Sequence, residues 1–168
     1  MQKTLILIRH AHRDNSRREL DNGLSEKGKD QARAIKRFFT ERFSKDDMGR
    51  GLWLASSPKL RCVETLQPVA KSVDRPVDVH PGVDEQGLRE STKAFEARVL
   101  AFIKEWQESD MGLTLLCSHG DWLPLASAQL LGAPVEMKKG GWLEFVLQGT
   151  GVEVNLQWCI PTFKYFFK

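Results

Sequence analysis

The sequence predicts an α/β protein, a three-layer α/β/α sandwich with a mostly parallel central sheet. Short apolar runs of strand length alternate with longer segments of helical periodicity. This alternation is typical of parallel strands whose connecting helices cover both faces of a sheet. Two apolar runs near the C-terminus predict a more antiparallel end. No repeat and no Pro/Gly/Ser-rich linker divides the chain, so residues 1–168 are expected to form a single domain.

The first half of the chain predicts two strands, each followed by a helix. These elements are strand 3–8, helix 25–43, strand 51–56 and a helix from 57 to about 73. Ser25 is expected to cap the first helix, because its hydroxyl can accept a hydrogen bond from a first-turn N–H. Ser57 and Pro58 form a preferred start for the second helix. Pro68 has no N–H to donate, so a kink or a restart is expected there.

The second half continues the pattern and ends in a hairpin. The expected elements are strand 76–80, helix 91–107, strand 113–118, a helix over about 122–131, and hairpin strands 142–147 and 152–158 around the turn 148–151. Gly132 is expected to end the last helix, and His80 to do no more than end its strand. The tail FKYFFK resembles an amphipathic anchor, although packing against the core is commoner for such a tail.

The overall composition is that of a soluble globular protein. Hydrophobic residues make up 41% of the chain and charged residues 28%, unlike disordered or membrane-spanning chains. The net charge of +3 and the pI near 8.8 do not predict a nucleic-acid-binding surface. The first apolar run is too short for a secretory signal or a membrane span, and the three cysteines lack CxxC spacing. We expect a cytoplasmic protein with reduced thiols and no membrane partner, while the oligomeric state stays open.

Chemically active side chains follow several of the predicted strands. In chain order they are Arg9 and His10 after the first strand, Arg61 after the second, Asp84 and Glu85 after the third, and Ser118 and His119 at the end of the fourth. Ligands of such sheets bind outside the carboxyl ends of the strands. The sequence therefore predicts one site that combines imidazole, guanidinium and carboxyl groups.

Four motifs cover these positions and carry a family resemblance. They are LIRHA at 7–11, LSEKGKDQA at 24–32, SSPKLRCVET at 56–65 and CSHGD at 117–121. In order and spacing they resemble the histidine phosphatase superfamily, which includes the cofactor-dependent phosphoglycerate mutases. The match spans most of residues 4–121, and four motifs together are far more specific than one. The resemblance implies a phosphoglycerate mutase-like fold and phosphoryl-transfer chemistry that needs no cofactor and no metal.

The resemblance also implies a role for each residue of the site. His10 is the nucleophile that takes up the phosphoryl group, and Arg9, Arg61 and His119 hold the phosphate, with His119 also counted as catalytic. The physical requirements agree, because a phosphate monoester is a dianion that must be neutralised and held in line. Imidazole is largely neutral at pH 7, and flanking arginines should lower the pKa of His10 further and keep a lone pair free.

The general acid has three candidates. Glu85 occupies the place where the resemblance puts the proton donor, after the third strand. Asp84 is the neighbouring alternative. Asp121 is another, because one branch of the superfamily carries its acid directly after the second histidine, although Gly120 intervenes here. A carboxyl group in a partly dehydrated pocket could keep its proton near neutral pH.

Departures from the family pattern bear on the substrate. Ala11 stands where many members have glycine, which resembles the small phosphohistidine phosphatases more than the mutases. Only nine residues, 82–90, join the third strand to the following helix. Mutases carry longer insertions there, and a short lid shields a phosphoenzyme poorly from water. We therefore expect hydrolysis, of a small phosphorylated substrate or of a phosphohistidine protein. Cations just after the nucleophile could bind other substrate anions; they are Arg13, Arg17 and Arg18.

Three alternatives stay open at this point. One is mutase-type phosphoryl transfer. The second is a metal-dependent hydrolase, because the HAH sequence at 10–12 is similar to paired histidines that bind zinc; it would need further ligands, and the chain has only four histidines. The third is a non-catalytic module that binds a phosphorylated ligand. His12 itself is at least as well explained as a residue at the rim of the site.

Overall fold

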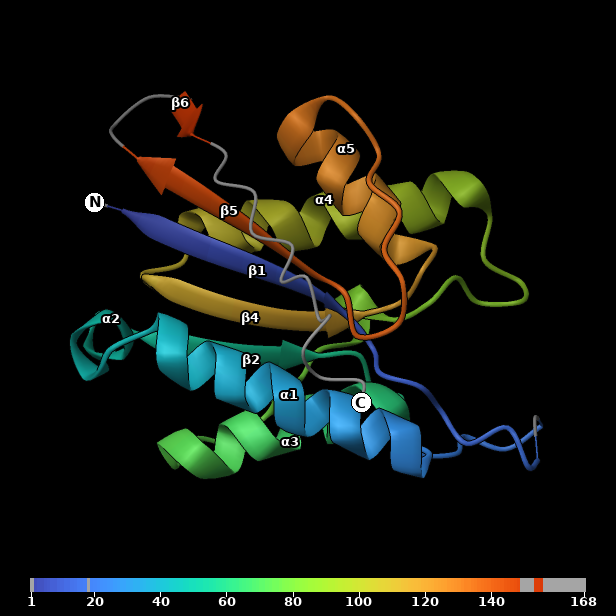
Figure 1. Ribbon diagram of the computed structural model, residues 1–168. Coiled ribbons are helices and arrows are strands. Elements are labelled where there is room, and N and C mark those ends of the chain that lie inside the picture. The colour runs from blue at the N-terminus through green and yellow to red at the C-terminus, as the bar shows by residue number, and fades with distance from the viewer. Residues whose placement is uncertain (1, 18, 149–152, 156–168) are drawn as a thin grey trace.

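The computed structural model describes residues 2–17, 19–148 and 153–155 (Figure 1). The strands are β1 (Lys3–Arg9), β2 (Leu52–Ser56), β3 (Asp78–Val79), β4 (Leu113–Ser118), β5 (Trp142–Gln148) and β6 (Glu153–Asn155). The helices are α1 (Glu26–Arg42), α2 (Lys45–Gly49), α3 (Leu60–Val73), the 3₁₀ turn η1 (Pro81–Val83), α4 (Thr92–Glu108) and α5 (Trp122–Leu131). No described helix is both long enough and apolar enough to cross a lipid bilayer.

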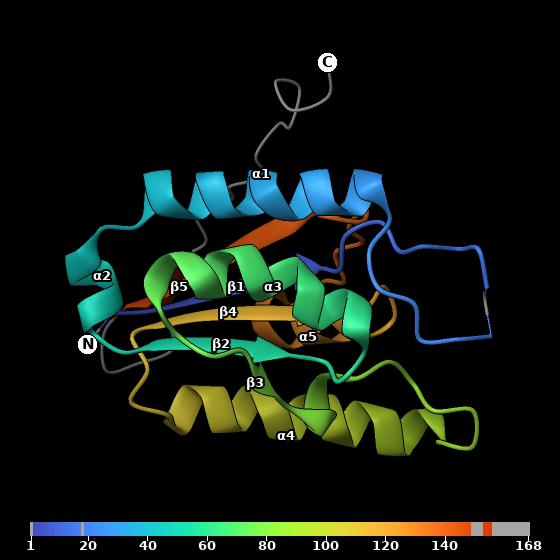
Figure 2. The ribbon, with the colours of Figure 1, turned by 90° about the horizontal axis from the view of Figure 1, so that it is seen from below.

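The strands form one mixed sheet in the order β3-β2-β4-β1-β5-β6. The first four strands in this order run parallel, whereas β5 is antiparallel to β1 and β6 is antiparallel to β5. Helices α1 and α3 cover one face, and α4 and α5 cover the other (Figures 1 and 2). The predicted three-layer α/β/α sandwich with an antiparallel end is confirmed.

Each face of the sheet has its own core. Successive side chains of a strand point to opposite faces, so Leu5 and Leu7 of β1 pack with α4 and α5, whereas Ile6 and Ile8 pack with α1 and α3. All four are fully buried. Burial of each such side chain contributes about 1.5–3 kcal/mol. The continuous apolar run of β1 is therefore explained by its place in the interior of the sheet, with a covered face on either side.

Several predicted helix ends are confirmed. The Ser25 hydroxyl accepts a hydrogen bond from the backbone N–H of Gly28 and caps α1. Gly132 ends α5 in the left-handed conformation, with φ of 75°. The antiparallel pairing of β5 with β6 confirms the hairpin. Of its predicted turn 148–151, Gln148 is the last residue of β5, and 149–151 lie outside the described residues, as do 152 and 156–158 of the second predicted strand and the tail FKYFFK.

Other predicted boundaries are wrong. Helix α3 begins at Leu60, so Ser57 is not its N-cap and Pro58 is not in its first turn; the Ser57 side chain is instead bonded within the candidate site. The helix continues through Pro68 without the expected restart. Strand β3 is shorter than the predicted 76–80, because it pairs only with the end of β2 at the exposed edge of the sheet. Helix α2 was not predicted from the sequence.

The carboxyl ends of β1, β2 and β4 lie side by side. Arg9 is in register with Ser118, and Ser56 is in register with Cys117. Just past the strands, the N–H of His10 donates to the carbonyl of Ser118 at 3.0 Å. The loops that follow β1 and η1 project from this same edge of the molecule (Figure 2). The fold thus brings the motifs together at one edge, as the sequence predicted.

Candidate active site

His10 directly follows β1 and is 6% exposed. Its Nδ1 lies 2.8 Å from the carbonyl oxygen of Ala11. A carbonyl only accepts, so Nδ1 carries the proton and Nε2 of the neutral ring has a free lone pair. Burial, together with the charges of His119, Arg61 and Arg9, lowers the pKa of His10 to about 3 despite the opposing effect of the Ala11 hydrogen bond. The ring is therefore an uncharged potential nucleophile at neutral pH.

His119 follows β4, and its ring centroid lies 5.3 Å from that of His10. Its Nε2 lies 2.7 Å from the Ser57 hydroxyl, which donates in turn to Asp84 Oδ1 at 2.8 Å. Burial lowers the pKa of His119, but the contacts of Nε2 with the Asp84 carboxylate at 3.3 Å and with the Cys62 sulfur at 3.5 Å together outweigh burial, and the pKa rises to about 9. The two histidines of the site therefore differ in charge near pH 7: His10 is neutral and His119 is cationic.

Arg61 lies in the first turn of α3 and is 4% exposed. Its Nη2 is 2.7 Å from Glu85 Oε2 and 3.2 Å from His119 Nδ1, and its Nη1 is 3.5 Å from Asp21 Oδ1. When His119 is protonated, Nη2 and Nδ1 are two donors in close contact, a geometry that suits one shared anionic acceptor. The Nε atom of Arg61 is buried and has no hydrogen-bond partner among the described residues. The guanidinium can therefore bind a further anion.

Arg9, at the end of β1, supplies the second guanidinium. Its Nη1 donates to the carbonyl of Met137 at 2.6 Å, and its buried Nε is without a partner in the described part of the chain. Gly120 allows this position, because an added Cβ would lie 2.7 Å from Arg9 Nη2. The glycine of the CSHGD motif therefore leaves room for the guanidinium beside His119.

The three carboxyl candidates lie in different surroundings. Asp84 accepts from Ser57 and from the N–H of Glu85. Burial raises the pKa of Asp84, but hydrogen bonding to His119, to Ser57 and to the N–H of Glu85 together outweighs burial, and the pKa falls to about 2. Asp121 accepts from the backbone N–H of Trp122 and from that of Gln86. Asp84 is therefore ionised at neutral pH, and Asp121 caps α5 and holds the loop that carries Glu85.

Glu85 differs from both, because its Oε2 binds only Arg61 among hydrogen-bonding groups of the described residues and its side chain is 40% exposed. Its Oε2 is also 3.7 Å from His119 Nδ1. The carboxyl group thus lies next to the cations that would hold a phosphate and is open to incoming ligand. The geometry supports Glu85 over the two aspartates as a proton donor.

Arg98 of α4 fixes the loop that carries Glu85. Its guanidinium binds the Glu90 carboxylate with two hydrogen bonds, of 2.9 and 2.7 Å. It also donates to a row of main-chain carbonyls, those of Pro81, Gly82, Asp84 and Glu85. The carbonyls of this partly buried stretch of backbone thus accept from a single side chain, which fixes the position of the Glu85 main chain.

The two histidines of the HAH sequence do not act as a pair. Nδ1 of His12 lies 2.8 Å from the Ser25 hydroxyl, near the start of α1, whereas His10 bonds to its own neighbour. Among the described residues, no three His, Cys, Asp or Glu side chains converge in a way that could hold a metal ion. The arrangement therefore favours the rim position for His12. His80, the remaining histidine, caps η1 through Nδ1 and contacts Glu105.

The loop after β1 carries the other arginines. Arg13 is half-buried, pairs with Leu24 through its backbone and donates from Nε to Asn15. Arg17 is exposed, and Arg18 lies outside the described residues. Arg13 and Arg17 remain candidates for contacts with substrate.

The profile of the histidine phosphatase superfamily, branch 1, matches residues 5–89, half of the chain. The matched region contains His10, Arg9 and Arg61, while His119 lies beyond it. The chain belongs to the histidine phosphatase superfamily. It is accordingly an enzyme of the phosphatase class.

Solved structures of other proteins share this histidine phosphatase fold. A mycobacterial glucosyl-3-phosphoglycerate phosphatase superposes with a TM-score of 0.71 at 20% identity, over 94% of this chain and 97% of that one. The α-ribazole phosphatase from Shigella flexneri superposes with a TM-score of 0.72 at 20% identity, over 94% of this chain and 96% of that one. Bacillus stearothermophilus YhfR superposes with a TM-score of 0.71 at 16% identity, over 93% of this chain and 96% of that one. No curated protein matches the sequence significantly.

The histidine phosphatase site also contains residues that sequence reasoning missed. Ser57 joins His119 to Asp84, Thr65 accepts from the N–H of Ala11 at 2.9 Å, and Arg98 fixes the Glu85 loop. Ser57 and Thr65 lie inside the SSPKLRCVET motif, so the motif was a signal that these side chains matter. Arg98 lies on a helix with no motif, and nothing in the sequence distinguished it.

Removing the Arg61 guanidinium should weaken inhibition by inorganic phosphate roughly ten- to a hundredfold, since each charge-assisted hydrogen bond is worth about 1.5–3 kcal/mol. The measurement is the phosphate inhibition constant of Arg61→Ala with p-nitrophenyl phosphate as substrate. Lys71→Ala, an exposed cation at the other end of α3, is the matched control and should behave as wild type. Unchanged inhibition in Arg61→Ala would place Arg61 outside the phosphate site.

Proposed function

We propose that this protein is a metal-independent phosphatase that hydrolyses phosphomonoesters or phosphohistidine through a phosphohistidine on His10. One observation carries the proposal. A neutral imidazole with a free Nε2 lies beside three cationic groups, and two of these, Arg9 and Arg61, have buried N–H groups without a partner in the described residues. Phosphate would supply the missing acceptors and the missing negative charge.

The reaction has two steps. In the first, His10 Nε2 forms a bond to phosphorus while the bond from phosphorus to the leaving oxygen breaks, and Glu85 gives that oxygen a proton. In the second, water attacks the phosphohistidine, the bond between nitrogen and phosphorus breaks, and the Glu85 carboxylate takes the proton of the water. Arg9, Arg61 and protonated His119 neutralise the equatorial oxygens in both steps.

The openness of the site supports hydrolysis over mutase-type transfer. The Glu85 side chain is partly exposed, and Leu88 at the tip of its loop is fully exposed, so the described residues form no closed lid over Glu85. A mutase must keep its phosphoenzyme from water until the phosphoryl group returns to substrate. Small phosphorylated molecules and phosphohistidine proteins can both reach such a site.

Chelation tests the proposal against the metal-dependent alternative. Hydrolysis of p-nitrophenyl phosphate should be unchanged after EDTA treatment and dialysis, because guanidinium groups neutralise the phosphate. Phosphate release is measured before chelation, after it, and after zinc is added back. Activity that disappears with EDTA and returns with zinc would overturn the proposal. An absence of any phosphate release would favour a non-catalytic binding module.

A further inference from the structure

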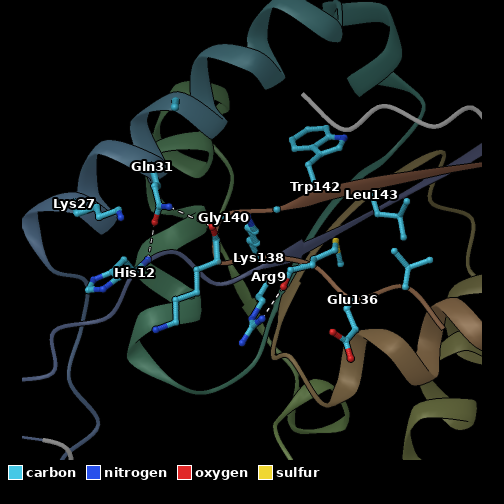
Figure 3. Close-up of a pocket in the computed structure, with 14 residues that line it drawn as sticks. Arg9, His12, Lys27, Gln31, Glu136, Lys138, Gly140, Trp142 and Leu143 are labelled. Atoms are coloured by element: carbon cyan, nitrogen blue, oxygen red, sulfur yellow. Dashed lines mark hydrogen bonds between the residues drawn. The ribbon is translucent and has the colours of Figure 1, made fainter. Parts of the chain in front are cut away.

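A cavity of about 840 Å³ borders the phosphate site. It lies between the first half of α1, the segment 135–141 and the first residues of β5 (Figure 3). Arg9 forms part of its wall and so belongs to both sites. Its volume is in the range of small-molecule pockets, roughly 300–1,000 Å³. Apolar side chains line one part of it; they are Ala34, Val135, Met137, Trp142 and Leu143.

The walls of the cavity are tied to the backbone that carries the nucleophile. Gln31 of α1 accepts from the N–H of His12 at 2.8 Å and donates to the carbonyl of Lys139 at 3.2 Å (Figure 3). The N–H of Gly140 donates to the carbonyls of Arg9 and His10, at 3.0 and 3.2 Å. Gly140 has φ of 77°, and a Cβ there would lie 3.3 Å from the Gln31 amide. The cavity is therefore held in a fixed place relative to His10.

Its charge is strongly positive. Four basic side chains line it, those of Arg9, Lys27, Lys138 and Lys139, against one acidic side chain, that of Glu136. None of the three lysines forms an ion pair with any described residue. Burial lowers the pKa of Lys139, and the nearby arginines and Lys27 lower it further; burial, Lys139 and Lys27 lower that of His12. An anion in the cavity would relieve this mutual repulsion.

We propose that this cavity binds the leaving group of the substrate, and that preferred substrates are phosphomonoesters whose leaving group carries a second anion on an apolar spacer. The proposal rests on the proposed phosphatase function. The transferred phosphoryl group binds to Arg9, Arg61 and His119. The second anion, a carboxylate or another phosphate, binds to Lys27 and Lys139. The spacer contacts the apolar wall. The proposal thereby restricts the substrates from phosphomonoesters in general to those that carry a second anion.

Binding of unreactive ligands tests the cavity without any need for turnover. Alkylphosphonates of increasing chain length are compared by calorimetry with the same chains ending in a carboxylate, and with chains ending in a second phosphonate. At the length that spans the two sites, the anionic terminus should strengthen binding about tenfold or more. The series whose binding is strengthened more shows whether the second anion is a carboxylate or a phosphate.

The same comparison in variants assigns the gain to the cavity. The advantage of the anionic terminus should disappear in the double variant Lys27→Ala/Lys139→Ala and persist in Lys29→Ala, an exposed lysine of α1 that does not line the cavity. Equal binding by all three series at every length, or an advantage of the anionic terminus that survives in the double variant, would overturn the proposal. Failure of the phosphatase proposal is distinguishable, because it appears as no hydrolysis of p-nitrophenyl phosphate and no labelling of His10.

Discussion

Replacing His10 with alanine should lower phosphatase activity by roughly 10⁴-fold or more, since removal of a covalent nucleophile can cost about 10⁶-fold. The substitution removes the atom that forms the bond to phosphorus. It should leave the fold intact, because within the described part of the chain the imidazole makes one hydrogen bond, to its own neighbour Ala11. Circular dichroism and thermal unfolding check the fold, and p-nitrophenyl phosphate turnover checks the activity.

A labelling experiment separates a lost nucleophile from a damaged site. Wild-type protein incubated with radioactive substrate and quenched in denaturant should retain acid-labile label, whereas His10→Ala should retain none. His12→Ala is the matched control, because His12 is two residues away but bonds to Ser25, and it should still be labelled. Label on the His10 variant would assign the nucleophile to another residue.

Glu85→Gln should have its effect on one class of ester. An alkoxide leaving group needs a proton in the transition state, whereas p-nitrophenolate leaves without one. We expect turnover of an alkyl phosphate to fall by about 10² to 10⁴-fold and turnover of p-nitrophenyl phosphate to fall little. Steady-state kinetics with both esters measure this, and the pH profile for the alkyl ester should lose one limb.

The neighbouring carboxylates serve as controls with different expected patterns. Asp84→Asn should slow the hydrolysis of both esters equally. Asp84 raises the pKa of His119 and so keeps a positive charge on the ring that binds the phosphate. Asp121→Asn should lower alkyl phosphate turnover less than Glu85→Gln does, since its amide oxygen can still accept from the N–H of Trp122 and only the acceptor for the N–H of Gln86 is lost. Equal losses on both esters in Glu85→Gln would mean that Glu85 shapes the site. A selective loss that is larger in Asp121→Asn than in Glu85→Gln would transfer the role of acid to Asp121.

The elements predicted correctly are those whose sequence signal lies within the element or next to it. The run of β1 is apolar because both faces of the sheet are covered, and Ser25 caps α1 through a neighbouring N–H. The motif residues were correctly expected at one edge, since parallel strands bring their carboxyl ends together. Strand β3 and the start of α3 were misplaced because long-range contacts decide them: Ser57 bonds to Asp84, 27 positions along the chain.

The cavity beside Arg9 could not be predicted from the sequence. Its cations come from α1 and from the segment 135–141, which no local periodicity relates. Gln31 joins these two segments across 108 positions of sequence. Contacts of this kind depend on the sheet order, in which β5 lies next to β1, and that order is a property of the whole fold.

The anchoring of Glu85 by Arg98 has a consequence for how the enzyme responds to warming. His10 follows a strand hydrogen-bonded on both sides, whereas the Glu85 loop is held mainly by the Arg98 guanidinium and the Asp121 carboxylate and has the fully exposed Leu88 at its tip. Segments with few buried apolar contacts open locally well below the free energy of global unfolding. Amide hydrogens of residues 85–90 should therefore exchange faster than those of β1. As temperature rises, the enzyme should lose its alkyl phosphatase activity before its activity on p-nitrophenyl phosphate, because the proton donor leaves the site while the nucleophile stays in place.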